Sequence, residues 1–100
     1  MSPKQKLILL FIHSGFANSQ YDLVKQLDKN DFRAELEKNL EPLLEAQLIS
    51  VCEFAFNSSP FKYSITGKGK ELVSETSFKQ DVITHIKAMN NAGFLLKLIR

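Results

Sequence analysis

Three side chains have types that can support catalysis or bind a metal, namely His13, Cys52 and His85. A cysteine nucleophile needs a base within hydrogen-bond reach of its thiol, and the spacing along the chain pairs Cys52 with neither histidine. Cys52 also lies in an apolar stretch, which predicts a buried structural residue. These three residues fit no zinc-ligand spacing, and Gly67-Lys68-Gly69 lacks the rest of a phosphate-binding loop. We therefore expect no catalytic site, no metal and no cofactor, and predict that the protein is not an enzyme.

Charge is spread unevenly along the chain. Residues 1–50 hold six basic and seven acidic side chains, whereas residues 51–100 hold seven basic and four acidic ones. The net charge of +2 does not by itself indicate nucleic acid. Any attraction for an anionic partner is expected toward the C-terminal half.

The length of 100 residues and the hydrophobic content of 44% suit one domain over residues 1–100, with its core at about residues 5–75. A single cysteine excludes an internal disulfide, which fits a reducing cytoplasm. The apolar run Leu7–Ile12 is far shorter than the roughly 20 residues of a membrane span. We expect a cytoplasmic protein with no membrane or targeting segment.

The first element is predicted to be a helix that begins at Ser2 and Pro3 and ends at Gly15. Serine is a good N-cap, proline suits the first turn, and glycine adopts the left-handed conformation that ends helices. The run at residues 7–12 is apolar on nearly all sides, which predicts burial on more than one face. A buried strand is the alternative, but the two end signals favour a helix.

A second helix is predicted from Ser19, which has capping-box spacing to Asp22, up to a turn at residues 28–30. A third is predicted over residues 31–46. Pro42 lies inside it, so this segment either kinks, as we expect, or is two short helices. Steps of three and four place one apolar stripe on it, formed by Phe32, Leu36, Leu40, Leu43 and Leu44.

A β-hairpin is predicted next, with strands at residues 48–56 and 61–65 around the turn-forming residues 57–60. Thr66 is expected to cap a short helix to Val73, and a last helix begins at about Phe78. The hairpin carries four aromatic side chains that could stack on bases, but strand aromatics usually pack on the core, and we expect that here; they are Phe54, Phe56, Phe61 and Tyr63.

The predicted fold class is α+β, mostly α, with three helices, a two-stranded hairpin and a C-terminal helix. This order is that of a winged helix-turn-helix. Two segments resemble the MarR-like and PadR-like bacterial transcriptional regulators over residues 5–75. Residues 39–49 resemble the end of a recognition helix that leads into the hairpin, and residues 63–72 resemble the second strand and its exit. At the position before Leu48-Ile49, where the family has a glycine, Gln47 is expected to be left-handed.

The resemblance implies a DNA-binding protein that regulates transcription, with the third helix in the major groove and the hairpin on the adjacent backbone. It implies groove contacts from Arg33, Lys38 and Asn39. The hairpin and the second helix are expected to contact the DNA through Ser58, Ser59, Lys62, Gln20 and Lys25.

A second hypothesis is a winged helix that binds a protein and no DNA. Residues 31–46 hold five acidic side chains but only Arg33 and Lys38 as basic ones. Duplex affinity depends largely on neutralised phosphates, so an acidic third helix suits a basic protein partner better.

The C-terminal segment, residues 78–99, is expected to form a homodimer interface. Its apolar residues recur at steps of four and three, and the first helix is apolar all round. Packing within the same domain is the alternative. The interface residues expected are Phe11, Val82, Ile86, Met89 and Leu96.

Overall fold

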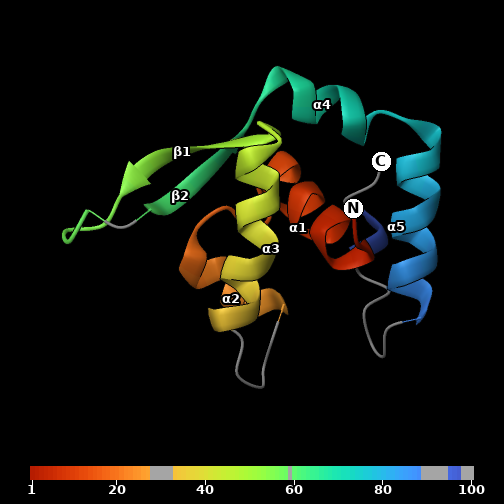
Figure 1. Cartoon of the computed structure of the whole chain (residues 1–100). Coiled ribbons are helices and arrows are strands. Elements are labelled where there is room, and N and C mark those ends of the chain that lie inside the picture. Colours follow the sequence, from red (N-terminus) through yellow and green to blue (C-terminus); the bar gives the residue numbers. More distant parts are fainter. Residues whose placement is uncertain (28–32, 59, 89–94, 98–100) are drawn as a thin grey trace.

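The computed structural model describes residues 1–27, 33–58, 60–88 and 95–97. Over these ranges the chain is a mixed α+β protein, mostly helical, with one antiparallel sheet of two strands (Figure 1). The predicted order of three helices, a hairpin and further helices is confirmed. The elements are α1 (Pro3–Ser14), α2 (Gln20–Leu27), α3 (Arg33–Glu45), β1 (Ile49–Phe54), β2 (Pro60–Ile65), α4 (Gly67–Val73) and α5 (Thr76–Ala88).

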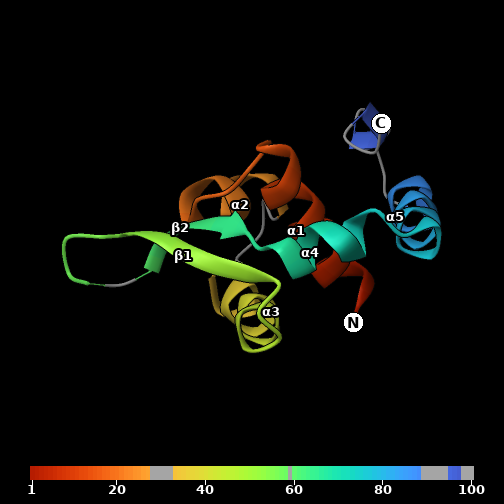
Figure 2. The ribbon, with the colours of Figure 1, turned by 90° about the horizontal axis from the view of Figure 1, so that it is seen from above.

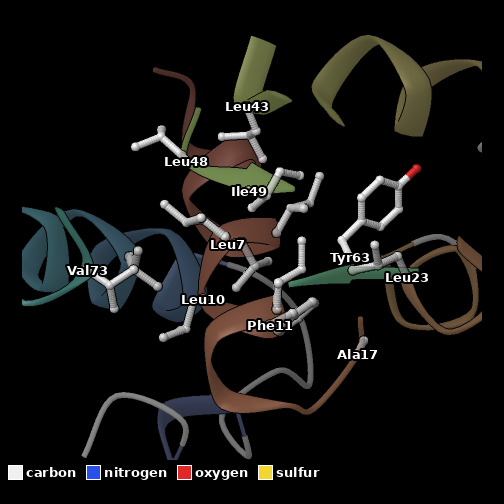
Figure 3. Packing of buried hydrophobic residues seen from close by; sticks show 14 of the residues in the cluster. Leu7, Leu10, Phe11, Ala17, Leu23, Leu43, Leu48, Ile49, Tyr63 and Val73 are labelled. Carbon is white, nitrogen blue, oxygen red and sulfur yellow. The ribbon is translucent and has the colours of Figure 1, made fainter. Parts of the chain in front are cut away.

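Helix α1 lies at the centre of the molecule, and the sequence signals at both of its ends are confirmed. The backbone N–H of Gln5 donates to Ser2 Oγ and the Gln5 side chain accepts from the Ser2 N–H, each at 3.2 Å. Gly15 ends the helix in the left-handed conformation at φ 78°. All six residues of Leu7–Ile12 are buried, because α1 packs against α3, α4, α5 and β2 (Figure 3).

Helix α2 begins as predicted, since the backbone N–H of Asp22 donates to Ser19 Oγ at 3.1 Å. Helix α3 continues through Pro42 as one α-helix, so the alternative of two short helices is wrong. Pro42 is exposed, and the N–H of Ala46 donates to its carbonyl at 3.0 Å, so helical bonding resumes at once. The apolar stripe packs Leu36, Leu40 and Leu43 into the core.

Gln47 adopts the expected left-handed conformation, with φ 59°. Its carbonyl oxygen accepts from Thr66 Oγ1 at 2.6 Å, and that same hydroxyl accepts from the N–H of Gly69 at 3.1 Å. Thr66 therefore caps α4, as predicted, and also joins it to the end of α3.

Replacing Gln47 by glycine should raise the free energy of unfolding by about 1 kcal/mol, because glycine adopts the left-handed conformation without a Cβ clash. Gln80→Gly, in the exposed interior of α5, is the matched control and should lower it by about 1 kcal/mol. Urea denaturation measures both values. An equal loss of unfolding free energy in the two variants would contradict a strained backbone conformation at Gln47.

The hairpin is formed by β1 and β2, in the register Ile49↔Ile65, Ser50↔Ser64 and Val51↔Tyr63. The register shifts between Val51 and Glu53, which leaves Cys52 without a pairing partner, and it shifts again before Phe54. Only the inner half of the hairpin covers the core. The residues there that are buried or half-buried are Ile49, Val51, Tyr63 and Ile65.

The link between α1 and α2 runs along the other edge of β2. The N–H of Tyr63 donates to the Asn18 carbonyl at 2.8 Å, and Ser19 forms an isolated antiparallel bridge with Lys62. The base of the hairpin is thereby fixed to the start of α2. Beyond that base the hairpin projects away from the helices, and α5 lies at the opposite end of the molecule (Figures 1 and 2).

Candidate binding surface

The structure divides the polar residues expected to contact DNA among α2, α3 and the hairpin. Gln20 and Lys25 lie on α2, Lys38 and Asn39 on α3, and Lys62 on β2. The hairpin turn contains Ser58, a left-handed residue at φ 68°. Ser59 and the side chain of Arg33 lie outside the described parts of the chain.

Two of these residues are engaged in the fold. Gln20 Nε2 donates to the Tyr63 hydroxyl at 2.9 Å, which links α2 to β2. Lys62 is half-buried at the bridge with Ser19. Lys25 and Lys38 are exposed. The predicted set therefore supplies few exposed cations to a phosphate backbone.

The exposed face of α3 is acidic. Glu37, Glu41 and Glu45 follow one another at steps of four, and all three are exposed. At 1.5 Å per residue this acidic row extends about 12 Å along the helix. Lys38 is the one cation on this helix whose side chain is described.

The basic residues of the C-terminal half lie elsewhere. Among the described residues, apart from Lys62 and the 3₁₀ turn at residues 95–97, they lie on α4 and α5, which carry Lys68, Lys70, Lys79 and Lys87. Helix α5 is at the end of the molecule away from the hairpin (Figure 2). The positive charge of α5 is thus separated from the surface of α2, α3 and the hairpin.

The expectation that the hairpin aromatics pack on the core is correct for Tyr63 and wrong for the three phenylalanines. The residues Phe54, Phe56 and Phe61 are 63%, 110% and 39% exposed. Cys52, expected to be buried, is also exposed. The reason is tertiary, because the outer half of the hairpin extends past the helices and has no core beneath it (Figure 2).

A groove of about 660 Å³ lies between α2 and the outer half of the hairpin, with α3 contributing at Glu37. Its described apolar side chains are Tyr21 and Val24 on one wall and Ala55, Pro60 and Phe61 on the other. Tyr21 is 68% exposed. The described residues that line it are Gln20, Tyr21, Val24, Lys25, Glu37, Ala55, Asn57, Pro60 and Phe61.

The groove contains Gln20 and Lys25 from the predicted set, whereas Lys38, Asn39, Ser58 and Lys62, the other predicted residues with described side chains, do not line it. Reasoning from the sequence missed Tyr21, Glu37 and Phe61 as parts of a site. The length of the strand predicted at residues 48–56 is one signal that part of the hairpin projects beyond the helices, because nine residues in a strand extend about 30 Å. That is longer than the roughly 10–12 Å width of the helix that it would have to cover.

Three of the residues expected at a dimer interface lie in the protomer's own core. Phe11, Val82 and Ile86 are at most 1% exposed, because α5 packs this face against α1. An ion pair between Lys6 and Asp81 joins the same two helices. Leu96 is half-buried against this core, and Met89 lies outside the described residues. The alternative of packing within the domain accounts for this row, and the homodimer itself stays a prediction.

No cluster of three or more His, Cys, Asp or Glu side chains that could hold a metal ion occurs in the described ranges. None of the helices described there has the length and apolarity that a membrane crossing requires. The chain matches no family model, no curated protein and no solved structure. The functional proposal therefore rests on the geometry and charge of the surface formed by α2, α3 and the hairpin.

Proposed function

We propose that this chain is a winged-helix domain that binds a protein partner through the surface formed by α2, α3 and the outer hairpin. The order of elements supports the winged-helix assignment, with three helices followed by a hairpin. The α1–α2 link supports it too, because it adds a short strand-like edge to β2 at Ser19 and Lys62. In this arrangement α3 is the helix of the helix-turn-helix unit that faces a partner.

The observation that carries the proposal is the set of exposed aromatics beside the groove. Burying a phenylalanine side chain is worth about 1.5–3 kcal/mol, which Phe54 and Phe56 do not gain in the isolated chain. Aromatic residues are enriched at protein interfaces, and a groove with a polar rim suits such a contact. A protein partner would remove these rings from water.

A second candidate function is duplex DNA binding in transcription regulation. The exposed cations Lys25 and Lys38 on the two helices of the helix-turn-helix unit favour it. The row of Glu37, Glu41 and Glu45 on α3 opposes it, because it would face phosphates. A cytoplasmic location and a homodimer, both expected from the sequence, stay predictions.

Selection from a random peptide library, with the whole chain as bait, tests the proposal. We expect peptides whose affinity falls about tenfold in Phe61→Ser, because a central aromatic supplies much of the binding energy. Cys52→Ser is the control, since Cys52 is exposed on the same hairpin but does not line the groove, and it should leave affinity unchanged.

Titration of the chain with a random-sequence DNA duplex tests the second candidate function. We expect no saturable binding at about 50 mM salt, because binding by the acidic face would lack counterion release. Duplex binding that weakens steeply with salt and is lost in Lys25→Ala or Lys38→Ala would replace the protein-binding proposal with DNA binding. Selected peptides that bind Phe61→Ser as well as the unchanged chain would also overturn the proposal.

A further inference from the structure

We infer that the partner segment is an amphipathic helix with lysine or arginine along one edge, held in the groove between α2 and the hairpin beside the acidic row of α3. This inference rests on the proposed protein-binding function and specifies the chemistry of the partner. It follows from three features of the surface, namely the apolar walls, the charge and its spacing.

The walls of the groove favour an apolar ridge. Tyr21 and Val24 face the groove from α2, and Pro60 and Phe61 face it from the hairpin. Phe54 is the cross-strand partner of Pro60 and extends the aromatic surface toward the hairpin end. A volume of about 660 Å³ is within the range of pockets that enclose sizeable apolar groups. A helix that inserts apolar side chains at steps of three and four is one of the common ways in which a groove is filled.

The charge of the surrounding surface selects a basic occupant. Glu37 lines the groove itself, and Glu41 and Glu45 continue from it along α3. The described side chains of α2 and α3 hold four carboxylates, with Asp22 as the fourth, and two ammonium groups, Lys25 and Lys38. On the hairpin, Glu53 and Lys62 are directly opposite each other and their charges offset. Over the described side chains the face is therefore net negative.

The spacing of the acidic row matches a helix better than an extended segment. Successive glutamates on α3 are four residues apart, which corresponds to a rise of about 6 Å. A partner helix that lies alongside α3 with basic residues at every fourth position presents its charges at the same interval. An extended strand places alternate side chains about 6.6 Å apart but alternates its faces, so its other side chains would point away from the groove.

Two synthetic helical peptides of equal length test the inference by fluorescence anisotropy with the full chain. One contains leucine and lysine in an amphipathic pattern, and the other contains leucine and glutamate. The lysine peptide should bind, and its affinity should fall as salt rises because exposed charges are screened. The glutamate peptide should bind at least about tenfold more weakly, because like charges would meet at the groove.

Charge reversal on α3 gives the sharper comparison. Glu37→Lys combined with Glu41→Lys should lower the affinity for the lysine peptide about tenfold and raise the affinity for the glutamate peptide. A general loss of folding would not raise either affinity. Glu75→Lys is the matched control, because Glu75 is exposed just before α5 and does not line the groove. It should change neither affinity.

The inference is overturned if the two peptides bind equally well, if neither binds, or if the double reversal leaves the preference for lysine unchanged. Each of these results leaves the proposed function standing whenever library peptides still depend on Phe61. Loss of that dependence contradicts the proposed function directly, so the two failures are distinguishable.

Discussion

Replacing Phe11 by alanine should lower the free energy of unfolding by about 4 kcal/mol, which is the usual range for a phenylalanine deleted from a packed core. The ring of Phe11 is fully buried at the centre of the core (Figure 3). Its centroid lies 5.2 Å from that of Phe16. A domain of this size has a total stability of about 5–15 kcal/mol, so this variant should lose a large part of it. The shift in the urea midpoint measures the loss.

The same substitution at Phe56 should change stability by no more than about 0.5 kcal/mol. Phe56 is 110% exposed, so its removal creates no cavity and exposes no other residue. The pair compares one residue type in two environments and checks whether the outer hairpin is solvent-exposed. A loss at Phe56 comparable to that at Phe11 would show that the hairpin aromatics pack on the core after all.

Gly69→Ala is expected to lower the free energy of unfolding by about 3 kcal/mol, as an overpacked core position does. A Cβ at this position would lie 2.7 Å from Ile65 Cγ1 and closer still to the carbonyl oxygen of Leu48. That carbonyl cannot withdraw freely, because it accepts from the Thr66 N–H at 3.1 Å. The gain of about 1 kcal/mol from alanine's higher helix propensity is too small to offset this clash.

Gly67 supplies the matched control for Gly69 within the same helix. A Cβ added at Gly67 would meet no atom within 4 Å, and its φ is not left-handed. Gly67→Ala should therefore leave stability unchanged or raise it by up to about 1 kcal/mol. Thermal unfolding of the two variants side by side measures the difference. Equal effects would contradict the close approach of α4 to the end of α3.

The parts of the fold that the sequence predicts are those fixed by local hydrogen bonds. Ser2, Ser19 and Thr66 each accept from a backbone N–H three residues ahead, and Gly15 ends α1 through its own left-handed φ. Such caps act within one helical turn, so residue type and spacing suffice to locate them. The left-handed Gln47 is expected from the resemblance instead, because the MarR-like and PadR-like regulators have a glycine at that position.

Exposure of the outer hairpin could not be predicted in this way. The alternation of apolar and polar residues in strands is the same whether a core lies beneath them or not, and the distance by which the hairpin projects is a tertiary property. The interpretation of Phe54, Phe56 and Cys52 as buried residues was therefore wrong. The apolar row on α5 has the same ambiguity, because α1 or a second copy could cover Val82 and Ile86.

Local sequence patterns also do not predict the groove. Its walls come from residues 20–25 and 55–61, and Glu37 comes from a third element. The sequence predicts Gln20 and Lys25 as contacts because they are polar residues of the second helix, and it does not indicate that Phe61 lies near them. The hydrogen bonds from Gln20 to Tyr63 and from Tyr63 to Asn18, together with the bridge between Ser19 and Lys62, bring these segments together.

The measurement that tests protein binding by this surface most directly is a nuclear magnetic resonance titration of the ¹⁵N-labelled chain with the leucine–lysine peptide and, separately, with a random duplex. The peptide should shift the amide signals of α2, the outer hairpin and α3 near Glu37, while the duplex should leave them in place. Shifts of the α2 and α3 amides by the duplex, with none caused by the peptide, would contradict it.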